Sequence, residues 1–433
     1  MISAPAERKI YFRRLLKENM YGHDVRELQE LLREFGFLTD PVDGYYGPIT
    51  VESVMEFQRT YALPVDGIAG PLTLKTIRKK ELPTLQRIHV VKEGEDIFRL
   101  AEREDITAEG LMRENGIKRP RRLYSGEELV IKEREVYLHL PEVNRREKEK
   151  IPSGAGLILP KVKLSPDGYI DNEFESKEDF SKMYLRIDIE GEELYSQISK
   201  TKWRKDTAVK LSKAYRRFAG LDLHLGELST KSILDLVRFI QVLSVAMKEK
   251  REELIVSLPP LDKDSLCVRK GSHLQNGLYS IGRYAHKVML PIYKKVLVDS
   301  PGPIAPYNHA RFVMKRMSTL IPPWKIIIVM PPLAYNWVKK KGELYLKPLT
   351  FKETFNLIYE SGCRVLLDSS NRSPYIKYRS QRVYNEIWFE NTWSIGHKLD
   401  LVGKYNLRGV ALEEFGTESF EFWDAIKDRF KCK

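Results

Sequence analysis

The stretch FAGLDLHLGEL, residues 218–228, decides how the longest part of this chain is expected to fold. It is a short apolar run with one embedded carboxylate, Asp222, and it closes with Gly226 and Glu227 ahead of a long helical pattern. A run of this kind predicts a parallel strand whose carboxyl end lies at the active-site rim of a β/α barrel. Because alternate side chains of a strand share a face, Asp222, His224 and Gly226 are expected to point into the barrel. Glu227 then points outward, unless a bulge at the glycine redirects it into the mouth.

The chain from residue 135 onward alternates strands with helices, which is typical of parallel α/β construction. Long amphipathic helices are predicted at residues 207–218 and 232–250. Eight strands are expected, the number that a closed (β/α)8 TIM barrel needs. They are residues 135–140, 156–164, 183–189, 220–225, 253–258, 287–293, 325–330 and 408–415.

The opening stretch resembles the fourth strand of glycoside hydrolase family 18, whose pattern reads D-G-x-D-x-D-x-E. Laid on that pattern, Ala219 stands at the first Asp and Asp222 at the second. His224 stands at the third Asp, and Gly226 stands where the family carries its catalytic Glu. The resemblance therefore implies a barrel of this family that lacks two of the three carboxylates nearest the chemistry.

Two later segments carry the same resemblance. The segment VMLPIY, residues 288–293, is similar to the sixth strand of the family and keeps Tyr293. Tyr335-Asn336-Trp337 resembles the family's G-Y-D-W element, with Asn336 in place of the Asp. Aromatic side chains in these segments could stack on sugar faces, although aromatic residues in such numbers mostly serve packing.

The last strand of the barrel is also recognisable. RGVALEEFG, residues 408–416, is similar to the eighth strand of the family, with Glu413 where the family places the tryptophan beneath the scissile sugar. The likeness spans roughly residues 155–430 and includes a small α+β insertion at about 363–395. It is closest to the spore-cortex branch of the family, whose members carry LysM modules ahead of the barrel.

The resemblance implies a particular chemistry, in which the acetamido oxygen of the substrate attacks the anomeric carbon. The enzyme must then supply an acid for the leaving oxygen, a carboxylate that orients the acetamide, and a tyrosine hydroxyl that holds it. A catalytically silent or strongly altered barrel is expected, with Glu227 or Glu413 as a displaced acid in the alternative. The catalytic candidates are Asp222, Glu227 and Tyr293, and the substrate-binding candidates are His224, Glu413, Tyr335, Asn336 and Trp337.

Each polar candidate also has a purely structural interpretation. Asp222 inside a strand can be a barrel-core residue paired with a cation, and His224 can be a hydrogen-bonded interior histidine. Arg186 and Asp188 share a face of the preceding strand and could pair with each other. Glu413 can be a solvated rim carboxylate.

The first 80 residues contain an internal repeat. Asp-Gly-Tyr-Tyr-Gly-Pro-Ile-Thr at residues 43–50 recurs as Asp-Gly-Ile-Ala-Gly-Pro-Leu-Thr at residues 66–73. In each copy Asp-Gly predicts a tight turn and Thr a helix cap. Residues 20–79 resemble the three-helix peptidoglycan-binding domain of wall hydrolases, which implies a domain at 1–80 that binds cell-wall glycan. Two capped turns in a bundle without a ligand are the alternative.

Residues 85–133 are predicted to fold as strand, helix, helix and strand. This order and its turn residues resemble a LysM module, the small βααβ domain that grips N-acetylglucosamine-containing glycans. In that family the sugar lies between the loop after the first strand and the loop before the second. The loop residues that the resemblance offers as sugar contacts are Gly94, Asp96, Ile97 and Ile117.

Composition limits the partners and the compartment. The formal charge of +13 lies almost entirely in the C-terminal part, which favours an anionic partner or is simply a solvated surface. Three scattered cysteines suggest neither a disulfide framework nor a metal cluster, and no cofactor or metal is expected. No run approaches 18 apolar residues, and the N-terminus has no apolar signal core. We therefore expect a chain made in the cytoplasm without a signal peptide or membrane span.

The sequence thus favours a multidomain glycan-binding protein of the spore coat or cortex: a three-helix domain at 1–80, a LysM module at 85–133, and a family 18-like barrel at 135–433. Its expected partner is peptidoglycan or a chitin-like glycan, with other spore-envelope proteins as further partners. The alternative is an active N-acetylglucosaminidase on peptidoglycan or chitin-type linkages. Nucleic acid ranks last, because no helix-turn-helix or aromatic-basic sheet signature accompanies the charge.

Overall fold

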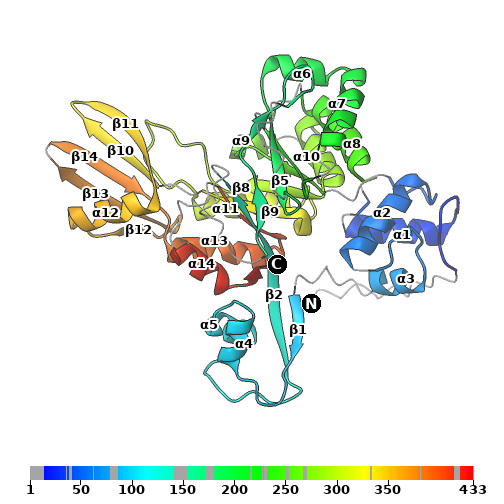
Figure 1. Ribbon diagram of the computed structural model, residues 1–433, viewed down its shortest axis with the longest axis horizontal. Helices are drawn as coiled ribbons and strands as arrows, with labels where there is room; N and C mark the ends of the chain where they lie inside the picture. The colour runs from blue at the N-terminus through cyan, green and yellow to red at the C-terminus, as the bar shows by residue number, and fades with distance from the viewer. Residues whose placement is uncertain are drawn as a thin grey trace, which may run out of the picture. The chain divides into compact units, whose positions relative to one another are not determined.

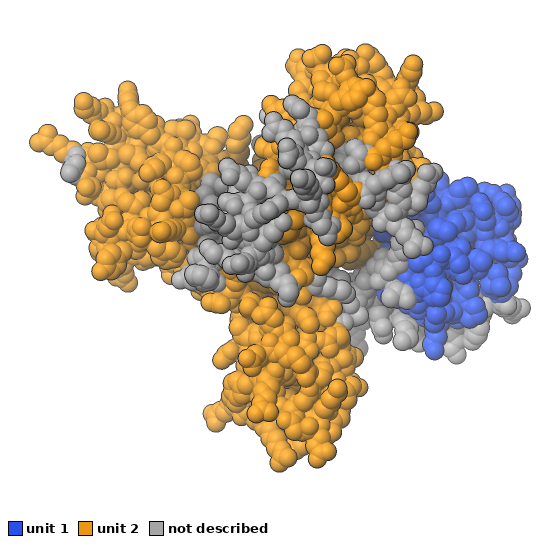
Figure 2. Space-filling model, viewed as in Figure 1, with its two compact units in different colours: residues 1–84 blue, residues 85–433 orange. Residues whose placement is uncertain are grey.

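The chain divides into two compact units, residues 1–84 and 85–433, in the computed structural model (Figure 2). The structure describes residues 14–35, 37–38, 41–61, 63–78, 86–140, 154–170, 180–214, 217–226, 228, 232–248, 253–266, 271–331, 334–380, 382–413 and 420–432.

Unit 1 is the predicted three-helix domain, with α1 His23–Glu34, α2 Pro48–Thr60 and α3 Pro71–Arg78. The sequence repeat has a structural cause, because each Asp-Gly turn is hydrogen-bonded to a buried glutamine of the preceding helix. Gln29 donates to the Asp43 carboxylate at 2.9 Å and accepts from the Gly44 N–H at 2.8 Å. Gln58 makes the same contacts one repeat later, donating to Asp66 at 2.8 Å. The repeat therefore encodes two equivalent turns, each held by hydrogen bonds to a buried glutamine.

Unit 2 begins with the LysM fold, formed by β1 Gln86–Val90, α4 Ile97–Arg103, α5 Ala108–Glu114 and the first half of β2 Glu128–His139. The strands β1 and β2 are antiparallel, with Gln86 opposite Lys132 and Val90 opposite Glu128. A small core of its own fills the space between strands and helices. The second half of β2 is the first strand of the barrel (Figure 1).

The predicted barrel is confirmed as eight parallel strands in the closed order β2-β3-β5-β6-β7-β8-β9-β15, with β15 and β3 both paired to β2. The other strands are β3 Gly156–Ile158, β5 Met183–Ile189, β6 Gly220–Leu225, β7 Glu253–Ser257, β8 Lys287–Pro291, β9 Ile326–Met330 and β15 Gly409–Leu412, with β4 Val162–Lys163 beside β5 and β16 Lys431–Cys432 beside β2.

The two faces of each strand separate two cores. In β5 the side chains of Leu185 and Ile187 pack toward the outer helices, whereas Tyr184 belongs to the cluster inside the barrel. This alternation puts the polar residues of the strands in the interior. The surrounding helices are α6 Glu192–Ile198, α7 Thr201–Ala214, α8 Ile233–Lys248, α9 Lys263–Leu266, α10 His273–Tyr284, α11 Tyr307–Met317, the 3-10 turn η2 Pro323–Lys325, α13 Thr392–Lys404 and α14 Phe420–Lys427.

The insertion begins at Ala334, far ahead of the predicted start near residue 363. It is a five-stranded antiparallel sheet, in the order β11-β10-β14-β13-β12, with one helix. Tyr335, Asn336 and Trp337 lie in β10, because residues 334–349 form a hairpin turned at Lys341 and Gly342. Its elements are β10 Ala334–Lys340, β11 Glu343–Leu349, α12 Phe351–Ser361, β12 Leu366–Asp368, β13 Ser373–Ser380 and β14 Val383–Trp388.

The helix α7 also differs from its prediction, because it starts at Thr201 and ends at Ala214. Its first turns are rich in charge, which hides the apolar periodicity there. They are nevertheless anchored, since Trp203 packs against the barrel core and its indole N–H donates to the Pro166 carbonyl at 2.6 Å. Within the described residues, no helix combines the length and apolar character that crossing a membrane requires.

Candidate functional site

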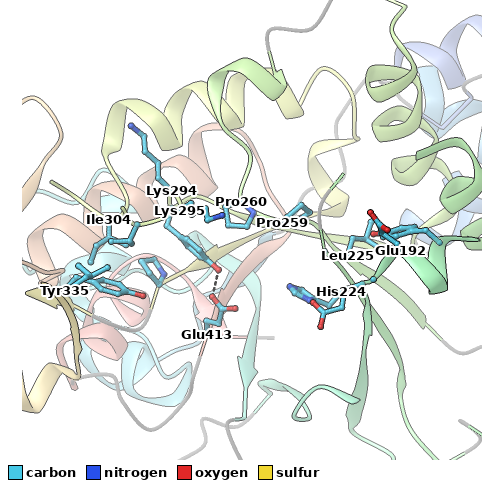
Figure 3. A pocket seen from close by; sticks show the side chains of 18 residues that line it. Glu192, His224, Leu225, Pro259, Pro260, Lys294, Lys295, Ile304, Tyr335 and Glu413 are labelled. Carbon is cyan, nitrogen blue, oxygen red and sulfur yellow. Dashed lines mark hydrogen bonds between the residues drawn. The ribbon is translucent and has the colours of Figure 1, made fainter. Parts of the chain in front are cut away.

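A cavity of about 870 Å³ opens at the carboxyl ends of the barrel strands (Figure 3). Segments after β5, β6, β7, β8, β9 and β15 all contribute to it, and the insertion adds two side chains. This is the face at which barrel enzymes carry their sites. The lining residues are Glu190, Gly191, Glu192, Tyr195, His224, Leu225, Gly226, Pro259, Pro260, Tyr293, Lys294, Lys295, Val296, Ile304, Pro331, Tyr335, Leu346 and Glu413.

Gly226 lines this cavity and offers no proton donor at the position of the family's catalytic acid. A side chain built there would begin 3.3 Å from Cβ of Glu190 and 3.3 Å from the carbonyl oxygen of Ile189. The end of β6 therefore lies close against the segment that follows β5. Glu227, the candidate displaced acid, lies outside the described residues.

Asp222 lies inside the barrel, beneath the cavity, and is fully buried. Its Oδ1 accepts a hydrogen bond from the Ser257 hydroxyl at 2.6 Å, and its Oδ2 lies 3.7 Å from Nε of Arg186. Burial raises the pKa of Asp222, and the charge of Arg186 opposes that rise. The carboxylate is thus held by the barrel interior and does not line the cavity.

Arg186 and Asp188 share a face of β5 but do not pair with each other. Arg186 donates to Nδ1 of His139 at 2.7 Å and lies beside Asp222, whereas Asp188 contacts His224 and Lys161. The β5–β6 register explains the exchange, because it sets Arg186 opposite Asp222 and Asp188 opposite His224. Neighbouring strands are about 4.8 Å apart, whereas residues i and i+2 of one strand are about 6.6 Å apart, so the cross-strand partners are nearer.

His224 and Asp188 form an oriented pair at the rim of the cavity. Nδ1 of His224 lies 2.9 Å from the Asp188 carboxylate, and the ring lines the cavity. Burial opposes ionisation of Asp188, but the hydrogen bond and charge of His224 outweigh it and lower the pKa of that carboxyl. Because Asp188 accepts from Nδ1–H, Nε2 of a neutral His224 is left as an acceptor toward the cavity.

Tyr293 and Glu413 meet on the opposite side of the mouth, where the tyrosine hydroxyl donates to the Glu413 carboxylate (Figure 3). Burial, with the charge of Glu413, raises the pKa of Tyr293 well above its ordinary value. The phenol is therefore a neutral donor whose proton is already engaged by a protein carboxylate. Arg186 lies 3.9 Å from the other oxygen of Glu413 and connects this pair to Asp222.

Tyr335 lines the cavity, whereas Asn336 and Trp337 do not. Asn336 is buried in the inserted sheet and donates to the side chain of Asn385 at 2.9 Å. The indole N–H of Trp337 donates to the Leu297 carbonyl at 2.9 Å, and the ring borders a neighbouring hollow of about 350 Å³. The structure thus brings His224, Tyr293, Tyr335 and Glu413 to one cavity.

The LysM candidates lie at the tip of that fold. Gly94 adopts a left-handed backbone, φ 79°, and Asp96 caps α4 by accepting from the N–H groups of Phe98 and Arg99. The side chains of Ile97 and Ile117 belong to the LysM core, with 2% and 9% exposed. These two residues can therefore offer a ligand mainly their backbone groups.

Glu95, which sequence reasoning missed, holds the same loop in place. Its carboxylate accepts from the Lys92 N–H at 2.8 Å and pairs with His89 at 2.7 Å and Arg103 at 2.6 Å. The Lys92 N–H, His89 and Arg103 together lower the pKa of Glu95 to about 2. The position of Glu95 directly after Gly94 was the sequence signal that could have identified it.

We expect Glu95→Ala to weaken binding of the chain to insoluble chitin about tenfold, the scale of one lost charge-assisted hydrogen bond. Because the pKa of Glu95 is lowered in the folded state, the contacts of its charged carboxylate are present above the ordinary glutamate range. They are lost only as the pH falls through about 2. The measurement is a depletion isotherm at pH 7. Glu93→Ala is the matched control, because Glu93 lies two residues before Glu95 and is exposed. Equal isotherms for both variants would exclude a role in binding for the contacts of Glu95.

Among the described residues, no three His, Cys, Asp or Glu side chains gather closely enough to hold a metal ion. An oriented imidazole, a neutral phenol and one carboxylate can bind sugar hydroxyl and acetamido groups by hydrogen bonds.

Comparisons with known proteins agree with the three-part architecture. Residues 21–77 match the model of the putative peptidoglycan binding domain, and residues 89–132 match that of the LysM domain. The barrel shares its fold with chitinases and with spore cortex-lytic enzymes.

Individual relatives are distant. The uncharacterized glycosylase YvbX of Bacillus subtilis is 24% identical over 55% of this chain and 70% of its own length. The cortical fragment-lytic enzyme of the same organism is 23% identical over 30% of this chain and 31% of its own length.

Two solved structures illustrate the likeness in fold. The spore cortex-lytic enzyme SleL of Bacillus megaterium superposes with a TM-score of 0.61 at 18% identity, covering 80% of this chain and 87% of that one. A chitinase from Chromobacterium violaceum superposes with a TM-score of 0.57 at 20% identity, covering 68% of this chain and 98% of that one.

Proposed function

We propose that this protein binds peptidoglycan or another N-acetylglucosamine-containing wall glycan, in the coat or cortex of the spore, and that its barrel binds the glycan without cleaving it. The proposal that the barrel does not cleave glycan rests on Gly226, which supplies no acid to the cavity at the position where the resembled family has its catalytic acid. The matches of residues 21–77 and 89–132 to glycan-binding domain models support binding to wall glycan. The spore assignment draws on the similarity to cortex-lytic enzymes.

The interior of the barrel supports a binding role further. In substrate-assisted cleavage one carboxylate and one tyrosine hydroxyl must both be available to the acetamide. Here Asp222 is engaged by Ser257 and Arg186, and Tyr293 donates to Glu413. Losing the general acid alone typically lowers the rate by about 10² to 10⁴.

The binding half is tested by sedimenting the full chain with insoluble peptidoglycan at increasing salt. Retention that persists at high salt is expected, because stacking and hydrogen bonds to sugars do not depend on counterion release. Complete loss at high salt would instead point to association by net charge alone, and equal retention on an uncharged cellulose control would point to nonspecific adsorption.

An active N-acetylglucosaminidase is the second candidate, and Glu413 favours it. This carboxylate lines the cavity beside Tyr293, where it is placed to act as a displaced acid. In this case new reducing ends from a chitin oligomer should disappear in Glu413→Gln or Glu227→Gln. Glu193→Gln, which is exposed and does not line the cavity, is the control that should retain them.

A further inference from the structure

The LysM fold and the barrel share one strand. Residues 128–132 of β2 pair with β1, residues 133 and 134 pair with β16, and residues 135–138 pair with β15. The last residues of β2 also pair with β3. Every residue of β2 therefore has a partner strand, and no unpaired linker separates the two folds.

Side-chain hydrogen bonds and ion pairs also connect the LysM fold to the barrel. Asp428, after α14, accepts from the Thr107 hydroxyl at 3.0 Å and pairs with Arg113 of α5 at 3.1 Å. Glu104, at the end of α4, binds Arg87 at 2.6 Å and Lys431 of β16 at 2.7 Å. Glu104 is only 6% exposed, so this contact lies within the junction.

Gly110 allows the closest approach. A Cβ atom at Gly110 would lie 2.2 Å from the backbone carbonyl oxygen of Asp428, nearer than any real side chain stands to backbone. The helix α5 of the LysM fold therefore contacts the end of α14 through backbone. A larger residue here must push the two folds apart.

The two candidate glycan sites lie at opposite ends of β2. The Gly94–Ile97 loop follows the end of β1, where Val90 pairs with Glu128 at the start of β2. The barrel cavity opens at the carboxyl ends of the strands, beyond His139 at the other end of β2. Eleven residue steps separate Glu128 from His139, which at about 3.3 Å per step is about 36 Å.

We propose that residues 85–433 act as a fixed two-ended bridge, in which the LysM loop holds one N-acetylglucosamine-containing glycan strand and the barrel mouth holds another. The bridge cross-links glycan strands and does not clamp two points of one strand, because the shared strand and the Asp428 and Glu104 contacts prevent the sites from turning toward each other. This inference rests on the proposed function at both sites.

The fixed geometry is tested by pulsed electron–electron resonance on spin labels at Glu93→Cys and Glu193→Cys, both exposed in the parent chain, with Cys267 and Cys363 changed to Ser and Cys432 to Ala. One narrow distance distribution is expected, unchanged by saturating N-acetylglucosamine tetramer. Gly110→Leu should broaden it, whereas Glu109→Leu on the exposed side of the same helix should not. A broad distribution in the parent chain would overturn the proposal.

Cross-linking is tested by light scattering of soluble peptidoglycan glycan strands mixed with the full chain. Scattering should rise with the parent and should fall further than the amount of bound protein does in Glu95→Ala and in Tyr335→Ala, although residues 1–80 keep each variant bound to peptidoglycan. Scattering that stays at the parent level in both variants, although their binding is weaker, overturns the bridge and leaves the proposed function intact. Sedimentation unchanged in both variants contradicts glycan binding at these sites and removes the basis of the bridge.

Discussion

Replacing Lys398 with methionine is expected to lower the free energy of unfolding of residues 85–433 by about 3–5 kcal/mol. Lys398 is fully buried in α13, and its ammonium pairs with the carboxylate of Glu390, which is itself 4% exposed. The Ser394 hydroxyl donates to the same carboxylate at 2.6 Å. The variant leaves Glu390 as an uncompensated buried charge, which costs far more than the pair contributes when intact.

Urea unfolding followed by tryptophan fluorescence measures this loss. The control is the double variant Lys398→Met with Glu390→Gln, which removes both charges and should recover most of the stability. A single variant no less stable than the double variant would show that the pair is not buried as described.

Replacing Arg186 with methionine is expected to cost a similar amount, about 3–5 kcal/mol at pH 7, because Asp222 would lose the cation that lies 3.7 Å from its carboxylate. Without Arg186 the pKa of Asp222 should rise further than burial already raises it. A carboxyl whose folded-state pKa is raised binds its proton more tightly when folded. The destabilisation should therefore grow as the pH rises from the ordinary aspartate range toward the raised pKa, and it should be smaller at pH 4 than at pH 7.

The measurement is the unfolding midpoint in urea at several pH values. Arg186→Met combined with Asp222→Asn is the matched control, because an amide removes the titrating group and should flatten the pH dependence. A pH-independent loss in the single variant would mean that Asp222 does not titrate in the folded barrel.

Much of the barrel could be predicted from the sequence, because its strands are buried on both faces and flanked by turns. The predicted ranges for β5 and β6 coincide with the observed strands. The charged start of α7 was missed, since apolar periodicity is weak in the turn that Trp203 and Arg204 anchor. The early start of the insertion, at Ala334, was not predicted from the sequence.

The candidate site could be predicted only in part. Strand alternation correctly placed Asp222 and His224 toward the interior. It could not reveal which partners they find, because β5–β6 register decides that Arg186 meets Asp222 and Asp188 meets His224. The sharing of β2 between two folds was equally hidden, since each half reads as an ordinary strand of its own domain.

Gly226 gives the mouth of the barrel no proton donor of its own at the position where the resembled family carries its catalytic acid. The most direct test of a barrel that binds glycan without cleaving it incubates the unmodified chain with peptidoglycan and measures new reducing ends and bound protein in the same sample. We expect bound protein with no reducing ends above the blank. Reducing ends that accumulate with time, in proportion to the protein added, would contradict that expectation.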